Sequence, residues 1–515
     1  MTLITTTWSK EVGWALYPLL LAAASAIALV VYEFVRWSAR LPKFGGPPGR
    51  PIVGNLWQIR QKDAPEQYRQ WAKQYGPVYQ IQLGNIPVLV VNSAAAAKAI
   101  FNQNSHATSS RPEFYTFHKL ISDTAGTTIG TSPYSDSLKR RRKAVASALN
   151  RPAVVSYIPH LDRETRVFLS EALKYGDSGK KGINPMPLFL RMNMSIGLTL
   201  HWGSRMESQN DLFHEIVHVE DTISNFRSTT GNLQDYIPLL RLNPWNTQSS
   251  QAVEMKLRRD RYIDILDKDL EKRIKQGTNK PCIRGNVLVD EDAKLTEMEL
   301  KSLNLTLLAA GLDTMNSAVG WGMALLAKRQ DIQKKALEAI REIYSADRPL
   351  CDAADDQSCT YLVAVIKEIL RYFSVTRLSL PRCTIQDFVY DEKMIPKGTV
   401  IFLNVWACNM DPELWDDPES FRPERWLETP DAPIFTFGTG GRMCVGMQLA
   451  YRELYVLFLR VLNSFRIEPD GFIETRPIEG VANPASLTTQ PKEYKVRFVP
   501  WNLAELEQGL KAAEG

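Results

Sequence analysis

The chain has 515 residues and a formal net charge of +5, from 62 lysines and arginines against 57 aspartates and glutamates. A charge so close to balance, with no basic patch interleaved with aromatic residues, argues against a nucleic-acid-binding protein. The six cysteines form no Cys-x-x-Cys pair and are too sparse for a disulfide framework, which argues against zinc and fits a reducing compartment. Length alone favours about three domains. No Gly/Ser linker, long charge run or internal repeat follows residue 60, so we expect one large domain over residues 61–515.

An uncharged segment, Val12–Tyr32, lies near the N-terminus. As a helix rising about 1.5 Å per residue it would span the roughly 30 Å hydrocarbon core of a bilayer. Arg36 and Arg40 follow it, and because positive residues stay cytoplasmic, the rest of the chain is expected to face the cytosol. A cleaved signal peptide is the alternative, but its basic residues would precede the apolar run. We predict a retained anchor over residues 1–35 and a basic, proline-rich hinge over residues 36–60.

Beyond the hinge, helical patterns outnumber strand patterns. Val78–Leu83 alternates apolar and polar residues, and Val88–Val91 returns after a turn, which predicts a hairpin that Pro87 excludes from a central strand position. Apolar spacing without breakers predicts helices over residues 137–150, 160–175, 208–228, 251–276, 297–328, 330–345, 361–373 and 447–461. The predicted fold class is mainly α-helical with a minor β-sheet region.

The segment Ser302–Ala327 contains a single charged residue, Asp313. A second membrane span is one interpretation, but an ionised aspartate in mid-span would cost about 2.5 kcal/mol or more. A helix buried in a large protein core fits better. Gly311 leaves room for a broad group to approach, and Asp313 and Thr314 place an acid beside an alcohol. Such a pair can deliver protons to a buried oxygen atom, although a threonine in a helix often only bonds to the preceding turn.

Two arginine motifs lie further along the chain. Glu368 and Arg371 are three residues apart on a predicted helix and can pair on one face, as in an ordinary helical salt bridge. Arg425, in the string Phe-Arg-Pro-Glu-Arg-Trp, supplies another cation. Arg382 follows a proline just before a predicted strand, and an arginine in a bidentate role suits a carboxylate.

A glycine-rich loop surrounds Cys444, in the string Phe437-Gly438-Thr439-Gly440-Gly441-Arg442-Met443-Cys444-Val445-Gly446. Glycines let backbone approach a flat, bulky group and expose N–H groups toward a sulfur. A thiolate held this way suits the axial ligand of a haem iron, and a helix from Met447 would place the sulfur at a helix N-terminus. A lone cysteine near glycines is usually a small buried hydrophobic residue. The pattern Phe-x-x-Gly-x-Arg-x-Cys-x-Gly fixes four positions around Cys444, which argues against a cysteine that only fills space in the core.

Together these motifs resemble the cytochrome P450 family over most of the chain, with Trp426 in place of a usual phenylalanine. The resemblance implies the P450 fold, a haem b group and a monooxygenase that inserts one oxygen atom of dioxygen into an organic substrate. The residues it assigns to the haem are Cys444 as axial ligand, Phe437 beside the thiolate, Gly438 and Gly446 in the loop, and Arg442 and Arg382 at the propionates. It assigns proton delivery to Asp313 and Thr314, and a buried structural triad to Glu368, Arg371 and Arg425.

The resemblance also implies partners. No flavin domain or dinucleotide fingerprint is present, so electrons are expected from NADPH through a separate cytochrome P450 reductase. The basic run Lys139–Lys143 is either a solvated helix face or a docking surface for an acidic donor. Many relatives carry Trp-x-x-x-Arg in this region; Tyr134 stands where the tryptophan is expected, with Leu138 four residues later, so the third propionate ligand stays open. The anchor and hinge imply the endoplasmic reticulum membrane, and Tyr236–Trp245 is either core or dips into the lipid.

Within the family the chain resembles fungal phenylacetate hydroxylases, in stretches such as Ser110–His118 and Thr229–Pro238. This implies ring hydroxylation of an aryl acetic acid. A P450 of fungal secondary metabolism, and an isomerase, dehydratase, sensor or carrier with the same fold, stay open as alternatives. A buried arginine can hold a carboxylate through two parallel N–H bonds. Arg377 is the first candidate for that role and Arg111 the second, with a purely structural role for Arg377 as an equal alternative.

Overall fold

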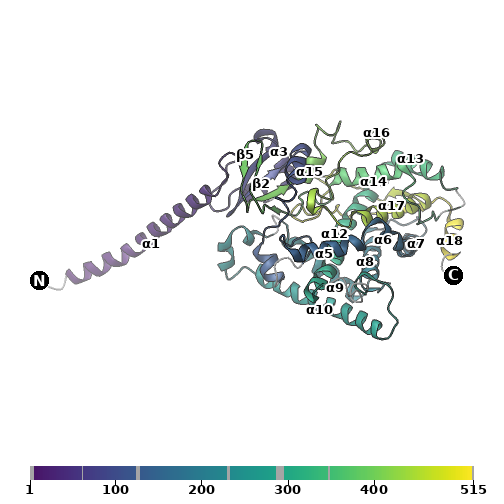
Figure 1. Ribbon diagram of the computed structural model, residues 1–515, viewed down its shortest axis with the longest axis horizontal. Coiled ribbons are helices and arrows are strands. Elements are labelled where there is room, and N and C mark those ends of the chain that lie inside the picture. The colour runs from purple at the N-terminus through teal and green to yellow at the C-terminus, as the bar shows by residue number, and fades with distance from the viewer. Residues whose placement is uncertain are drawn as a thin grey trace.

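The computed structural model describes residues 5–60, 62–122, 128–228, 232–285, 295–345, 348 and 350–512. Helix α1 (Thr5–Ser38) projects from the body of the molecule (Figure 1). Its segment Tyr17–Arg36 has a mean hydropathy of 2.0 and is long and apolar enough to cross a membrane. The predicted N-terminal apolar helix is therefore confirmed.

Helix α1 continues past residue 35, the predicted end of the anchor, because its last turns contact the body. The Glu33 carboxylate accepts the backbone N–H of Ile52 at 2.6 Å, and the Tyr32 hydroxyl binds the Asn85 side chain. Arg36 is buried and pairs with Glu33. The end of α1 is thus attached to the hinge and to the first hairpin.

Four strands form the main sheet, in the order β1-β2-β6-β3. Strands β1 (Val78–Leu83) and β2 (Ile86–Val91) are the predicted hairpin. The prediction that Pro87 keeps this hairpin out of a central position is wrong for β2, which also pairs in parallel with β6 (Val400–Leu403). Pro87 is tolerated because the ladder to β6 begins one residue later, at Val88, so no bond to β6 needs its missing N–H. The remaining strands are β3 (Arg382–Cys383), β4 (Phe388–Tyr390), β5 (Lys393–Ile395), β7 (Phe465–Pro469) and β8 (Val496–Pro500).

The eight predicted helices are all present, with ends shifted by a few residues. Their observed bounds are α5 (Asp136–Ala148), α7 (Ile158–Tyr175), α9 (Asp211–Phe226), α10 (Gln248–Lys275), α12 (Glu297–Lys328), α13 (Gln330–Arg341), α14 (Thr360–Phe373) and α17 (Met447–Ser464). Helix α8 (Met186–Trp202) was not predicted, because it is buried on nearly every side and lacks the polar stripe of an amphipathic helix. Shorter helices are α2 (Leu56–Ile59), α3 (Ala64–Tyr75), α4 (Ala94–Ala97), α6 (Arg151–Ser156), α15 (Val405–Asn409), α16 (Arg425–Glu428) and α18 (Leu503–Ala512).

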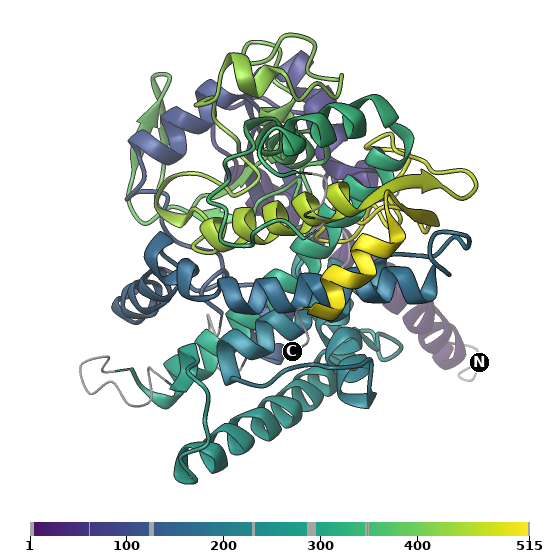
Figure 2. The same ribbon diagram turned by 90° about the vertical axis from the view of Figure 1, so that its right-hand side faces the viewer.

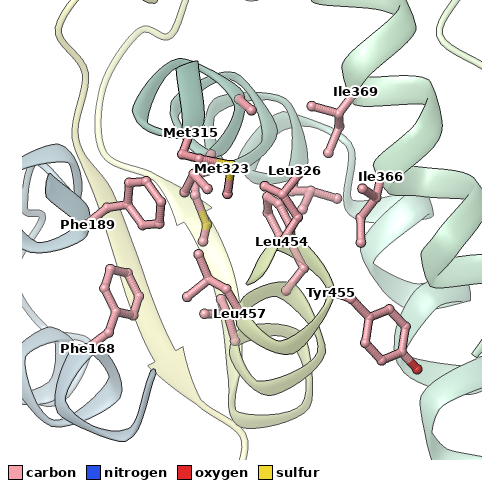
Figure 3. Packing of buried hydrophobic residues seen from close by; sticks show 14 of the residues in the cluster. Phe168, Phe189, Met315, Met323, Leu326, Ile366, Ile369, Leu454, Tyr455 and Leu457 are labelled. Atoms are coloured by element: carbon pink, nitrogen blue, oxygen red, sulfur yellow. The ribbon is translucent and has the colours of Figure 1, made fainter. Parts of the chain in front are cut away.

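Helix α12 crosses the centre of the molecule. In both views α9 and α10 form the lower edge, while α14 and α16 lie above α12 (Figures 1 and 2). The N-terminus of α12 carries a capping box between Thr296 and Glu299. In Figure 3, Met315, Met323 and Leu326 of this helix face apolar side chains from α7, α8, α14 and α17. Because α12 is enclosed by protein, the second-span interpretation of Ser302–Ala327 is excluded and the core-helix interpretation holds.

Candidate active site

The Cys444 loop, Phe437–Gly446, contains a short 3-10 turn over Gly440–Arg442 and ends at the start of α17. Gly438 and Gly440 have positive φ angles of 71° and 65°. A Cβ at Gly440 would lie 1.9 Å from the carbonyl oxygen of Phe101, so only glycine fits there. The backbone N–H of Cys444 donates to the Phe437 carbonyl at 2.9 Å. These contacts fix the direction in which the cysteine side chain leaves the loop.

Cys444 is the one exposed cysteine of the six, all of which lie in the described ranges. Protein still surrounds it, and burial raises the pKa of its thiol, while a hydrogen bond from the Gly446 N–H and the charge of Arg142 act in the opposite direction. A bound metal cation would lower the pKa of the thiol further, because a thiol that coordinates a metal is deprotonated. An accessible sulfur with an N–H donor and an arginine nearby can act as a metal ligand.

Buried arginines gather next to this loop. Arg442 donates to the carbonyl oxygens of Ser109, Ser132 and Ile129 at 2.9–3.0 Å. Arg382 donates to the Thr439 carbonyl at 2.7 Å, and its buried Nε has no hydrogen-bond partner among the residues that the structure describes.

No acid balances these charges within the part of the chain that the structure describes. Burial lowers the pKa of Arg382 and of Arg442 to about 9, and the neighbouring charges that add to the effect all come from arginines. The pKa of Arg111 is also lowered, mainly by burial and further by the charges of Arg382, Arg442 and Arg142. Buried cations without acidic partners require an anion, and guanidinium groups suit carboxylates. The cluster therefore fits the two propionates of a haem.

The cluster also includes Arg142 of α5, which donates to the carbonyl of Met443, the residue before Cys444, at 3.3 Å. Leu138 is buried and stands four residues before Arg142, whereas Tyr134 lies outside α5 and packs edge-on against His106. In this chain the spacing of Trp-x-x-x-Arg is thus carried by Leu138 and Arg142. The sequence left the third propionate ligand open in this region, and Arg142 is a candidate for it.

The acid–alcohol pair lies on α12. Asn193 of α8 donates to the carbonyl of Gly311 at 3.0 Å, and a Cβ at Gly311 would meet nothing nearer than this side chain, at 3.8 Å. The Thr314 hydroxyl donates to the Ala310 carbonyl at 2.7 Å, which leaves its oxygen lone pairs available to accept. Burial raises the pKa of Asp313 to about 6, against the effect of a hydrogen bond from Ser224 of α9. Asp313 can therefore exchange a proton near neutral pH.

The predicted ion triad is present and fully buried. Glu368 accepts two bonds from Arg371, at 2.7 and 2.8 Å, and one from Arg425 at 3.1 Å. The indole N–H of Trp426 also donates to Glu368, at 2.9 Å. A phenylalanine, the usual residue at this position in the family, has no N–H group and could not form this bond. The network ties α14 to the segment that leads into the Cys444 loop.

The sequence profile described as cytochrome P450 matches residues 44–498. The chain belongs to the cytochrome P450 family. It is 61% identical to a 3-hydroxyphenylacetate 6-hydroxylase of Emericella nidulans, over 95% of this chain and 96% of that protein. It is 41% identical to a phenylacetate 2-hydroxylase of the same fungus, over 92% and 94% of the two chains. A zebra fish cytochrome P450 solved with progesterone covers 85% of this chain and 99% of its own, with a TM-score of 0.72 and 22% identity, which confirms the fold.

The two arginines predicted to bind substrate in this P450 are engaged by the protein itself. Arg377 is buried, pairs with Asp63 and donates to the Pro477 carbonyl. Arg111 donates to the carbonyl oxygens of Gly130, Leu380 and Pro381. Their partners favour the structural role that the sequence left open for Arg377, and place Arg111 in the cation cluster rather than free for a substrate.

Proposed function

We propose that this chain is a haem-thiolate monooxygenase that hydroxylates the ring of an aryl acetic acid. The observation that carries the proposal is the 61% identity to a 3-hydroxyphenylacetate 6-hydroxylase over nearly the whole of both chains. The Cys444 loop and the unbalanced arginine cluster beside it support haem binding by the same fold.

In the proposed mechanism the haem supplies an iron centre that activates dioxygen, with a thiolate ligand that favours cleavage of the O–O bond. Cys444 would provide that sulfur, and Arg442, Arg382 and Arg142 would hold the propionates. Gly311 keeps α12 clear of side-chain bulk where oxygen must fit. The Thr314 oxygen orients a proton donor there, and Asp313 passes protons inward from Ser224 and the α9 side.

A separate reductase that uses NADPH is the proposed electron donor. Lys139, Arg140 and Lys143 are exposed on α5, the helix whose Arg142 contacts the backbone of the Cys444 loop. A donor with an acidic face would be steered to this helix and so to the sulfur side of the haem.

A spin-shift screen tests the substrate class. Phenylacetate and 3-hydroxyphenylacetate should shift the haem spectrum of the purified holoenzyme at lower concentrations than neutral terpenoids do. If terpenoids bind and aryl acetates produce no shift, the chain is a P450 of another substrate class, such as secondary metabolism.

We also propose that the protein is anchored in the endoplasmic reticulum membrane through α1, with the large domain in the cytosol. Deleting residues 1–31 should move most of the protein to the soluble fraction while haem content and turnover with a soluble assay substrate are kept. This deletion leaves Tyr32, Glu33 and Arg36 in place, whose contacts hold the hinge. Fractionation of membranes, with and without the deletion, measures the effect.

A second membrane contact is expected from Leu239, Leu242 and Trp245, which are 59%, 79% and 85% exposed. Residual membrane binding of the deletion variant should fall further when Leu242 and Trp245 are changed to serine. Full membrane binding after both changes would contradict the proposed anchoring.

Replacing Asp313 with asparagine should stabilise the holoenzyme at neutral pH and lower its coupled turnover. The carboxyl ionises near 3.8 when unfolded and near 6 when folded, so the wild-type protein loses stability as the pH rises through that window, by at most about 3 kcal/mol. Asparagine carries no charge and escapes this loss. Thermal unfolding should therefore show an advantage for Asp313→Asn at neutral pH that disappears below the window, and more reductant should be lost to peroxide. An equal advantage at all pH values would contradict the raised pKa.

A further inference from the structure

A pocket lies between the segment Arg111–His118, the end of α9 and the segment before β3. Its volume is about 30 Å³, or about 430 Å³ when the space that is open to solvent is counted. The lining is mostly aromatic and apolar, with a few polar groups, as in many small-molecule sites. Lining residues used below are Arg111, Phe114, Phe117, His118, Phe226, Arg227 and Asp235.

Two charged residues place this pocket relative to the catalytic groups. Arg111 lines the pocket and also belongs to the arginine cluster beside the Cys444 loop. Arg227 lines it too, and its charge interacts with that of Asp313 on α12. The lining of the pocket thus interacts electrostatically with the proposed propionate site through Arg111 and with the acid–alcohol pair through Arg227.

Three of the four arginine, histidine and aspartate side chains in the lining are held by hydrogen bonds from the protein. Arg111 is held by three backbone carbonyls. Asp235 accepts the backbone N–H and the hydroxyl of Thr116, at 2.7 and 2.9 Å, and burial raises its pKa to about 6. Burial lowers the pKa of His118, so its ring is neutral at physiological pH, and Nδ1 accepts the N–H of Phe114 at 2.9 Å.

Arg227 is the fourth group, and its charge interacts with those of Glu220 and Asp313 without a direct ion pair in the described residues. Its Nε is buried and has no hydrogen-bond partner among the described residues. The two acids that interact with it are engaged elsewhere: Glu220 accepts the hydroxyl of Tyr262, and Asp313 is bonded to Ser224. Its guanidinium carbon lies 5.4 Å from the centre of the Phe117 ring.

We propose that Arg227 binds the carboxylate of the substrate, with the aromatic wall of the pocket, Phe117 above all, packing on the substrate ring. The assignment rests on the proposed aryl-acetate function and names the residue that selects for it. A guanidinium beside an aromatic ring matches a molecule in which a carboxylate is one carbon from an aryl group. Two parallel N–H bonds would fix the carboxylate, and the ring would then be held toward α12 at a set distance.

The test compares an acid with its neutral amide. Spin-shift titrations of the holoenzyme with phenylacetate and phenylacetamide are run on wild type, Arg227→Gln and Arg227→Lys. Loss of a charge-assisted bond should weaken acid binding by Arg227→Gln about 10- to 100-fold, while amide binding changes less than about twofold. Arg227→Lys keeps the charge but not the fork geometry and should recover part of the acid affinity.

A matched control is Arg241→Gln. Arg241 also stacks on an aromatic ring, that of Tyr115 at 4.1 Å, but it donates to the Gln234 carbonyl and does not line the pocket. This variant should bind acid and amide as wild type does. Haem content and the carbon monoxide spectrum verify that each variant is folded.

Several outcomes would overturn the assignment. Equal weakening of acid and amide would mean that Arg227 shapes the pocket without reading charge. Unchanged affinities with more peroxide from both ligands would mean that Arg227 only positions Asp313. If wild type binds phenylacetate without hydroxylating it, the proposed function fails while the Arg227 comparison still decides its own question. If wild type binds neither ligand, both proposals fail.

Discussion

Replacing Cys444 with serine should abolish the thiolate-type carbon monoxide spectrum and all monooxygenase activity. A serine hydroxyl is not deprotonated by iron as readily as a thiol and donates less electron density, so cleavage of the O–O bond loses its driving ligand. Cys444 is the only exposed cysteine in the described ranges, and it interacts electrostatically with Arg142 of the arginine cluster. Reduced difference spectra of the purified variant and of wild type measure the effect directly.

Cys383→Ser is the matched control. Cys383 is half-buried and directly follows Arg382, so it lies near the proposed propionate site but outside the glycine loop. Its replacement should leave the spectrum unchanged. A Cys444→Ser protein that keeps both the thiolate spectrum and turnover would show that another residue ligates the iron.

Replacing Glu368 with glutamine should prevent accumulation of folded holoenzyme. Glu368, Arg371 and Arg425 are all within 3% of complete burial, and the substitution leaves two buried guanidinium groups without their acid. Removing one partner of a buried ion network costs about 3–5 kcal/mol, a large share of the stability of a typical domain. The expected result is low haem content and a lowered unfolding midpoint in any protein recovered.

Trp426→Phe provides the milder comparison. It restores the residue that the family usually carries and removes one N–H bond to Glu368 while both arginines stay paired. The expected loss is about 1.5–3 kcal/mol, with the haem spectrum intact. Glu368→Gln protein with wild-type haem content and unfolding midpoint would show that the network contributes little to stability.

Much of the fold can be predicted from the sequence because it follows from patterns among residues that are close together in the chain. The spacing in α12, the capping box at Thr296 and the alternation in β1 each reflect interactions within a few residues. Two features of the fold could not be predicted from the sequence because they depend on residues far away in the chain. The internal position of β2 depends on β6, more than 300 residues later, and α8 is surrounded by protein, which removes the polar face that would have marked it.

In the candidate site, too, the residues of local motifs were predicted and the residues that depend on distant contacts were not. Cys444, the acid–alcohol pair and the triad are compact motifs, so short strings located them. Arg227 was not singled out, since nothing in its neighbours along the chain shows that its charge lacks a partner; that follows only from where α9 ends relative to Phe117 and Asp313. Arg377 was predicted to hold the carboxylate of a substrate, whereas its guanidinium is paired with Asp63, which is far away in the chain.

Turnover in isotopically labelled dioxygen is the most direct test of the central proposal. Purified holoenzyme, a P450 reductase and NADPH would be incubated with 3-hydroxyphenylacetate, and the products analysed by mass spectrometry and NMR. The account predicts a dihydroxyphenylacetate with one labelled oxygen atom in the new ring hydroxyl, formed in step with NADPH consumption. A product whose new oxygen comes from water, or NADPH consumption with no ring-hydroxylated product, would contradict it.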